Sequence, residues 1–190
     1  MRPYGSKSHL LVVLAVLGCV LSSAQAPAPG SNAARLSSEF QERARQYLDL
    51  RKRVAGTSPS PTNSLEKIAA KQRELANKVR IARAGIPQGA IFTPPIAQFF
   101  RDQITSTLHG QNGAKIRASL RHAEPVKMDL QVNQSYPESL PLQSTPPSLL
   151  LNLPQLPDGL EYRLIDRELV LRDNEANIIV DYVPNAFPEQ

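Results

Sequence analysis

The 190-residue chain has one cysteine, no tryptophan, ten other aromatic residues and nine glycines. The cysteine, Cys19, lies in an apolar run near the N-terminus. If that run is removed, the remaining chain can form no disulfide and depends on its core for stability. Few aromatic residues indicate an aliphatic core. The chain has no nucleophile elbow, phosphate loop or dinucleotide fingerprint. These absences remove the sequence support for several common enzyme classes.

The N-terminal residues have the pattern of a secretory signal peptide, which we place at 1–24. Basic residues come first, followed by the apolar run 10–21 and then by small residues. The run is about 12 residues long, too short to span a bilayer core of roughly 30 Å as a helix. Cleavage after Ala24 is favoured over cleavage after Ala26, because the latter would leave a proline first. We therefore expect a periplasmic or secreted protein without a transmembrane helix in its mature chain.

Residues 16–19 read Val-Leu-Gly-Cys, which leaves an alternative open. This order is similar to a bacterial lipoprotein box, in which Cys19 would be lipidated and become the first residue. The apolar run continues past Cys19, as it does in an ordinary signal peptide. Lipid anchoring through Cys19 is therefore the alternative to a soluble exported chain.

Charge divides the remaining chain into a basic front and an acidic back. Residues 35–83 carry twelve lysines and arginines against five acids, whereas residues 126–190 carry four against ten. Two interpretations stay open. The halves fold against each other with complementary surfaces, or the basic helices face an anionic partner such as a membrane surface or wall polymer.

Periodicity predicts an α+β protein. We expect a flexible leader at 25–34, a helical region at 35–124, an extended Pro/Leu-rich strap at 125–159, a three-stranded antiparallel β-meander at 160–183 and a tail at 184–190. In the helical region, a helix over 38–54 and a second one capped by Asn63 would pair as an antiparallel hairpin. One or two further helices follow, the first opened by Thr93 and Pro94.

The candidate binding residues are cations on the polar faces of the first two helices. Their attraction to an anionic surface would be long-range and sensitive to salt. Without aromatic side chains interleaved among them, the basic helices do not predict nucleic-acid binding. The candidates are Arg43, Arg45, Arg51, Lys52, Arg53, Lys71, Lys78 and Arg83.

Metal and catalytic patterns are weak. His109 and His122 lie 13 residues apart without the spacing of a zinc site. Residues 173–177 have oxygen-bearing side chains at alternate positions, but they lack the later ligands of a calcium loop, so we interpret them as a solvated turn. We expect no metal, cofactor or catalytic residues.

Six segments carry a resemblance over nearly the whole chain after the signal: 40–52 (FQERARQYLDLRK), 66–73 (EKIAAKQR), 91–94 (IFTP), 133–137 (NQSYP), 146–150 (PPSLL) and 156–181, which ends in ANIIVD. In these segments the chain resembles a family of uncharacterised exported bacterial proteins, and the resemblance implies no activity. The terminal meander, with GLEYR, LVLRD and IIVDYV, is similar over about 25 residues to the small β module of periplasmic proteins of nickel and cobalt homeostasis.

These observations predict a non-enzymatic envelope or secreted protein that acts by binding or as a structural component. Its partner would be an anionic envelope component or another exported protein. A small periplasmic hydrolase with an unrecognised site is one alternative, and it requires a concave pocket with a perturbed acid or histidine. A metal-responsive periplasmic protein is the other, and it rests on the meander alone.

Overall fold

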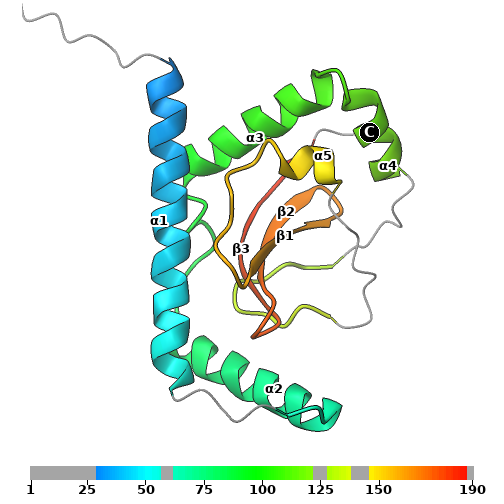
Figure 1. Cartoon of the computed structure of the whole chain (residues 1–190). Coiled ribbons are helices and arrows are strands. Elements are labelled where there is room, and N and C mark those ends of the chain that lie inside the picture. The colour runs from blue at the N-terminus through cyan, green and yellow to red at the C-terminus, as the bar shows by residue number, and fades with distance from the viewer. Residues whose placement is uncertain (1–28, 57–61, 122–127, 138–145, 188–190) are drawn as a thin grey trace, which may run out of the picture.

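The computed structural model describes residues 29–56, 62–121, 128–137 and 146–187. The predicted α+β class is confirmed, with helices first and a three-stranded antiparallel sheet last (Figure 1). The expected signal peptide at 1–24, including Cys19, lies outside the described residues. The elements are α1 (Pro29–Ala55), α2 (Leu65–Ala82), α3 (Pro94–His109), α4 (Gly113–Arg121), α5 (Pro147–Leu150), β1 (Leu160–Ile165), β2 (Glu168–Asp173) and β3 (Ile178–Val183).

Helix α1 begins well before the expected start near residue 38. It includes residues 29–34, so the prediction of a flexible leader is wrong for the described part of that segment. Pro29 stands at the first helical position. Proline is tolerated there because the backbone N–H of that position makes no hydrogen bond within the helix. Arg35 then bonds to Asn32 and Glu39 one turn away on either side. These local contacts extend the helix beyond the part that its apolar stripe predicts.

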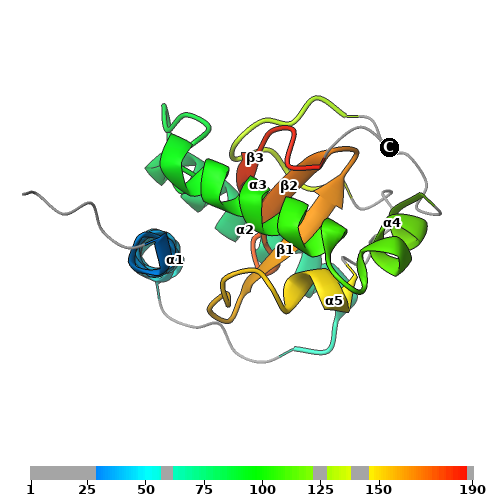
Figure 2. The ribbon, with the colours of Figure 1, turned by 90° about the horizontal axis from the view of Figure 1, so that it is seen from above.

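Helix α2 lies across the lower end of α1 instead of alongside it, so the expected antiparallel hairpin does not form (Figures 1 and 2). The two helices still contact each other. Only Ala76 and Val79 of α2 are buried, whereas Leu65 at its start is 83% exposed. Ser64 caps the helix in place of the predicted Asn63, because its side chain accepts the N–H of Lys67. The stripe of α2 is therefore only partly covered.

The sheet has the predicted order β1-β2-β3. Asp166 takes a positive φ of 53° in the two-residue turn that joins β1 to β2. A register shift between Leu171 and Arg172 interrupts the pairing of β2 with β3. The strands bury side chains on both faces of the sheet, so each face needs a cover.

Helices α1 and α3 supply one cover, and aromatic rings fill the contact. Phe40 lies between Phe92 and Phe100, with ring centroids 5.3 and 4.8 Å away. Tyr162 from β1 adds its ring at 6.3 Å from Phe40. The core cluster is mainly aliphatic, as predicted, but a group of aromatic rings forms around Phe40.

The predicted strap covers parts of both faces. Tyr136 packs with Ile165, Val170 and Ile179 on the second face of the sheet. Further along, residues 147–150 form the short helix α5, and Leu149 is buried in the main core. The strap is thus not extended throughout, as the sequence predicted. Leu149 and Leu153 pack against the body of the protein, whereas Leu151 is 86% exposed.

Candidate functional site

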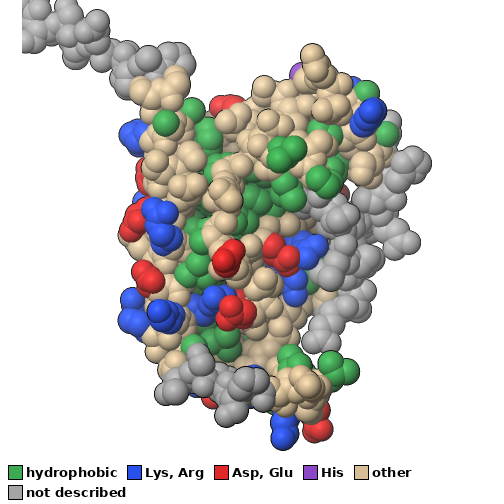
Figure 3. Space-filling view, viewed as in Figure 1, with side chains coloured by type: hydrophobic (Ala, Val, Ile, Leu, Met, Phe, Trp, Pro, Cys, Tyr) green, Lys and Arg blue, Asp and Glu red, His purple; other side chains and the backbone are tan. Residues whose placement is uncertain are grey.

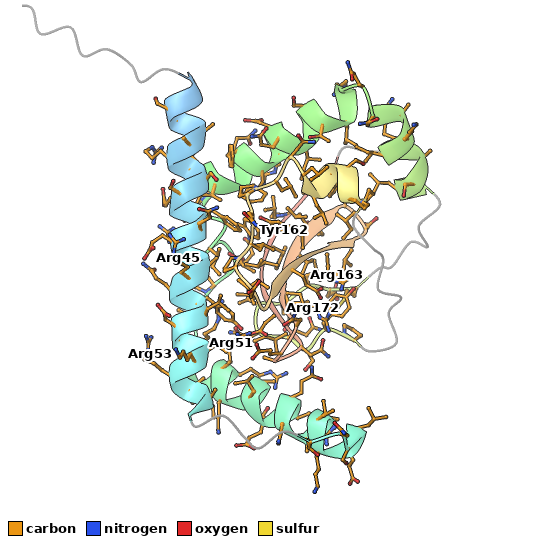
Figure 4. The ribbon with its side chains drawn as sticks, viewed as in Figure 1. Arg45, Arg51, Arg53, Tyr162, Arg163 and Arg172 are labelled. Atoms are coloured by element: carbon orange, nitrogen blue, oxygen red, sulfur yellow. The ribbon has the colours of Figure 1, made fainter. Side chains whose placement is uncertain are left out.

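The structure divides the eight predicted surface cations into inward and outward groups. Arg51 points from α1 toward the sheet, whereas Arg45 and Arg53 point away from it (Figure 4). Arg83 is buried, with 6% of its surface exposed. Arg51 and Arg83 are therefore wrong as surface-binding residues. They belong to a seam between the basic helices and the acidic sheet.

Asp173 at the end of β2 is the centre of this seam and is fully buried. Its carboxylate accepts the Tyr47 hydroxyl at 2.6 Å and an Arg51 N–H at 3.0 Å. It also accepts the backbone N–H groups of Glu175 and Ala176. Burial, and secondly the Asp173 charge, raise the pKa of Tyr47 well above its usual value. The turn over 173–177 is therefore anchored by a buried Asp173, whereas Asn174 and Glu175 at its tip are exposed, as predicted for a solvated turn.

Arg83 makes the second contact of the seam. Its guanidinium donates to Asn133 Oδ1 at 2.8 Å and to the Val180 carbonyl at 2.7 Å. It also lies over the Tyr47 ring, 5.0 Å from the centroid. Burial lowers the pKa of Arg83 from its usual value. This cation thus joins α1, the 133–137 segment and β3.

Asp181 of β3 completes the seam. Its carboxylate accepts the backbone N–H groups of Gly89, Ile91 and Phe92 at 2.7 to 2.9 Å. These bonds fix the connection between α2 and α3 onto the sheet. The first interpretation of the charge division, in which the two halves fold on each other, is thus supported by specific contacts.

The other predicted cations differ in how far they face solvent. Arg43 is half-buried, since it donates to Glu39 and to the Ala90 carbonyl. Lys71 is also half-buried. Lys52 and Arg53 are exposed in the last turn of α1. The remaining two pair with acids on their own helices, Arg45 with Glu42 and Lys78 with Glu74.

A concave site, separate from the seam, lies between the strap and β1 and has a volume of about 410 Å³. Figure 3 shows hydrophobic side chains over this part of the molecule, with charged ones below them. Glu161 lines the site and bonds to both Arg163 and Arg172. Burial favours the neutral acid, but the two arginine hydrogen bonds outweigh it and lower the pKa of Glu161. A general acid needs the opposite shift.

The described residues contain no group of three His, Cys, Asp or Glu side chains placed to hold a metal ion. His109 donates from Nδ1 to the Thr105 carbonyl at 2.8 Å. His122 lies outside the described residues. None of the helices in the described ranges has both the length and the apolar character needed to cross a membrane.

Comparison with protein-family models, curated proteins and solved structures finds no match to this chain. The seam residues that sequence reasoning missed are Tyr47, Asp173 and Asp181. The sequence could have identified Asp181, because a carboxylate inside the most apolar predicted strand needs hydrogen-bond donors to be buried there. Tyr47 and Asp173 are 126 positions apart, and no local pattern connects them.

Proposed function

We propose that the protein is a non-enzymatic, exported binding protein that attaches to an anionic component of the cell envelope. One observation carries the proposal: Lys52 and Arg53 remain exposed at the C-terminal end of α1 after the seam has engaged Arg51 and Arg83. Cations in this last helical turn also satisfy the helix dipole, so their position costs the fold little.

The exposed charges form an edge and not a pocket. Lys and Arg side chains follow the outer side of α1, with acids between them (Figure 3). Lys71 and Lys78 of α2 add charge near the lower end of the molecule, although Lys78 already pairs with Glu74. Such an edge suits an extended anionic surface, because contacts between exposed charges need no fixed geometry.

The test is co-sedimentation of the purified protein with isolated cell-envelope fragments at low and high salt. A cation near an anionic lipid surface contributes about 1 kcal/mol, so the double variant Lys52→Gln/Arg53→Gln should bind about 30-fold more weakly at low salt. The matched control is Lys115→Gln, because Lys115 is exposed on α4 at the far end of the molecule. The Lys115→Gln variant should bind within about twofold of wild type. Single replacement of Lys52 or of Arg53 should weaken binding about fivefold.

High salt should abolish binding of the wild type, because screening weakens contacts between exposed charges. Unchanged binding of the double variant, or no binding of the wild type at low salt, would remove the proposal. Circular dichroism and urea unfolding of each variant show whether it is folded. Surface changes of this kind should move the unfolding free energy by no more than about 0.5 kcal/mol.

A further inference from the structure

A groove of about 540 Å³ lies between α2 and two segments of the acidic half, 135–137 and 176–177. The contributing residues of α2 recur at spacings of three, four and seven, which places them along one side of the helix. Among the described residues that line the groove there is no carboxylate. Its polar side chains are those of Gln72, Arg73, Asn77, Arg80, Ser135, Tyr136 and Asn177.

Among the described residues, all hydrogen-bond partners of Arg80 are neutral groups. Its guanidinium donates to the Asn133 carbonyl at 2.9 Å, to Asn77 Oδ1 at 2.7 Å and to Ser135 Oγ. These bonds use three of its five N–H donors and leave its charge uncompensated by them. Arg51, in contrast, meets two carboxylates. A fixed and uncompensated guanidinium is preorganised to bind an anion.

Arg73 supplies a second positive charge two helical turns away. It lies seven positions before Arg80, which is about 10 Å along the helix axis. Its side chain is exposed, so it can turn toward an anion seated beside Arg80. Among the described acids near it, Glu74 pairs with Lys78 and Glu175 pairs with Arg51. The described lining of the groove therefore carries two positive charges and no negative one.

We infer that this groove binds a phosphate group, as inorganic phosphate or as a phosphomonoester. A phosphate carries close to two negative charges and three acceptor oxygens. Two guanidiniums match its charge, and the amide of Asn77 supplies further N–H donors beside Arg80. The site does not rest on the function proposed above, because it uses neither Lys52 nor Arg53.

The experiment is isothermal titration of inorganic phosphate, methyl phosphate and acetate into the purified protein at low ionic strength. Both phosphates should give saturable heat, and acetate should bind at least tenfold more weakly. Arg73→Gln should weaken phosphate binding at least tenfold. The matched control is Lys67→Gln, which removes one positive charge from the same helix at an exposed position outside the groove lining and should change affinity less than twofold.

A second variant, Arg80→Lys, keeps the charge and removes the planar fork, so it should also weaken phosphate binding in a protein that circular dichroism shows to be folded. Flotation with phosphatidic acid vesicles separates the sources of the phosphate. Vesicle binding that Arg73→Gln abolishes identifies a lipid headgroup, and phosphate binding without vesicle binding identifies a soluble ester. Equal losses for Arg73→Gln and Lys67→Gln, equal affinity for acetate, or no saturable heat with phosphate would overturn the inference.

Discussion

Replacement of Asp173 by asparagine tests whether the seam holds the two halves of the protein together. The change removes the charge and keeps the shape of a side chain that is fully buried. It leaves the Arg51 guanidinium, whose side chain is 12% exposed, with Glu175 as its remaining carboxylate partner among the described residues. Breaking a buried ion pair on one side costs about 3 to 5 kcal/mol, and the Tyr47 hydroxyl also loses a charged acceptor. We expect a loss of about 3 kcal/mol in unfolding free energy.

Urea unfolding followed by circular dichroism measures the loss, with the slope of the transition checked for constancy. Glu175→Gln is the matched control. It removes the other acid from the same arginine, but the Glu175 side chain is 60% exposed. An exposed pair contributes at most about 1 kcal/mol. If Asp173→Asn costs no more than Glu175→Gln, the seam is not an energetic anchor and our account of Asp173 is wrong.

Three further predictions concern the same region. Arg83→Met should lower the unfolding free energy measured with urea by about 3 kcal/mol, because it removes charged hydrogen bonds to Asn133 and Val180. Arg45→Met, on the outer side of α1, should lower it by under about 0.5 kcal/mol. Equal losses would contradict the role of Arg83. Glu161 has a lowered pKa, so its ionised form stabilises the fold above pH 4.5, and this stability is lost as the pH falls through the lowered value. In Glu161→Gln, the unfolding free energy measured from about pH 2.5 to 6 should therefore fall less steeply toward acid pH. An unchanged fall would refute this. Gly159→Ala should lower the unfolding free energy by about 2 kcal/mol, because φ is +92° there and a Cβ would lie 2.9 Å from Arg51 Nη1. Gly30→Ala, where a Cβ in the helix would meet no other atom, should be neutral or stabilising. Thermal unfolding compares the two variants, and equal midpoints would contradict the strain at Gly159.

Patterns with a short period predicted the fold well. Alternation over 160–183 gave the three strands, and the Asp166 turn lies where two polar residues separate them. Thr93 and Pro94 marked the start of α3 in the same way. The crossing of α1 and α2 was not predictable from their stripes. An apolar stripe shows that a helix is covered, but it does not identify the element that covers it.

The candidate site was predictable only in part. The excess of basic residues predicted exposed cations on the helices, and Lys52 and Arg53 are exposed. The same count could not separate Arg51 from Arg53, which are two positions apart and point in opposite directions (Figure 4). The difference arises from Asp173, more than a hundred residues later. A partner so distant in the sequence leaves no trace in a local charge count.

The charge available for binding is therefore smaller than the basic front half suggests, and it is differently placed. Arg51 lies 3.0 Å from the Asp173 carboxylate, so at longer range the two act as a dipole and contribute little net attraction. Arg80 is half-buried in the contact between the halves, yet its hydrogen-bond partners among the described residues are a carbonyl, an amide and a hydroxyl. Its charge is not cancelled by these contacts, and it faces a groove that also holds Arg73. Compensation by carboxylates, more than exposure alone, decides which cations of this protein can attract a ligand.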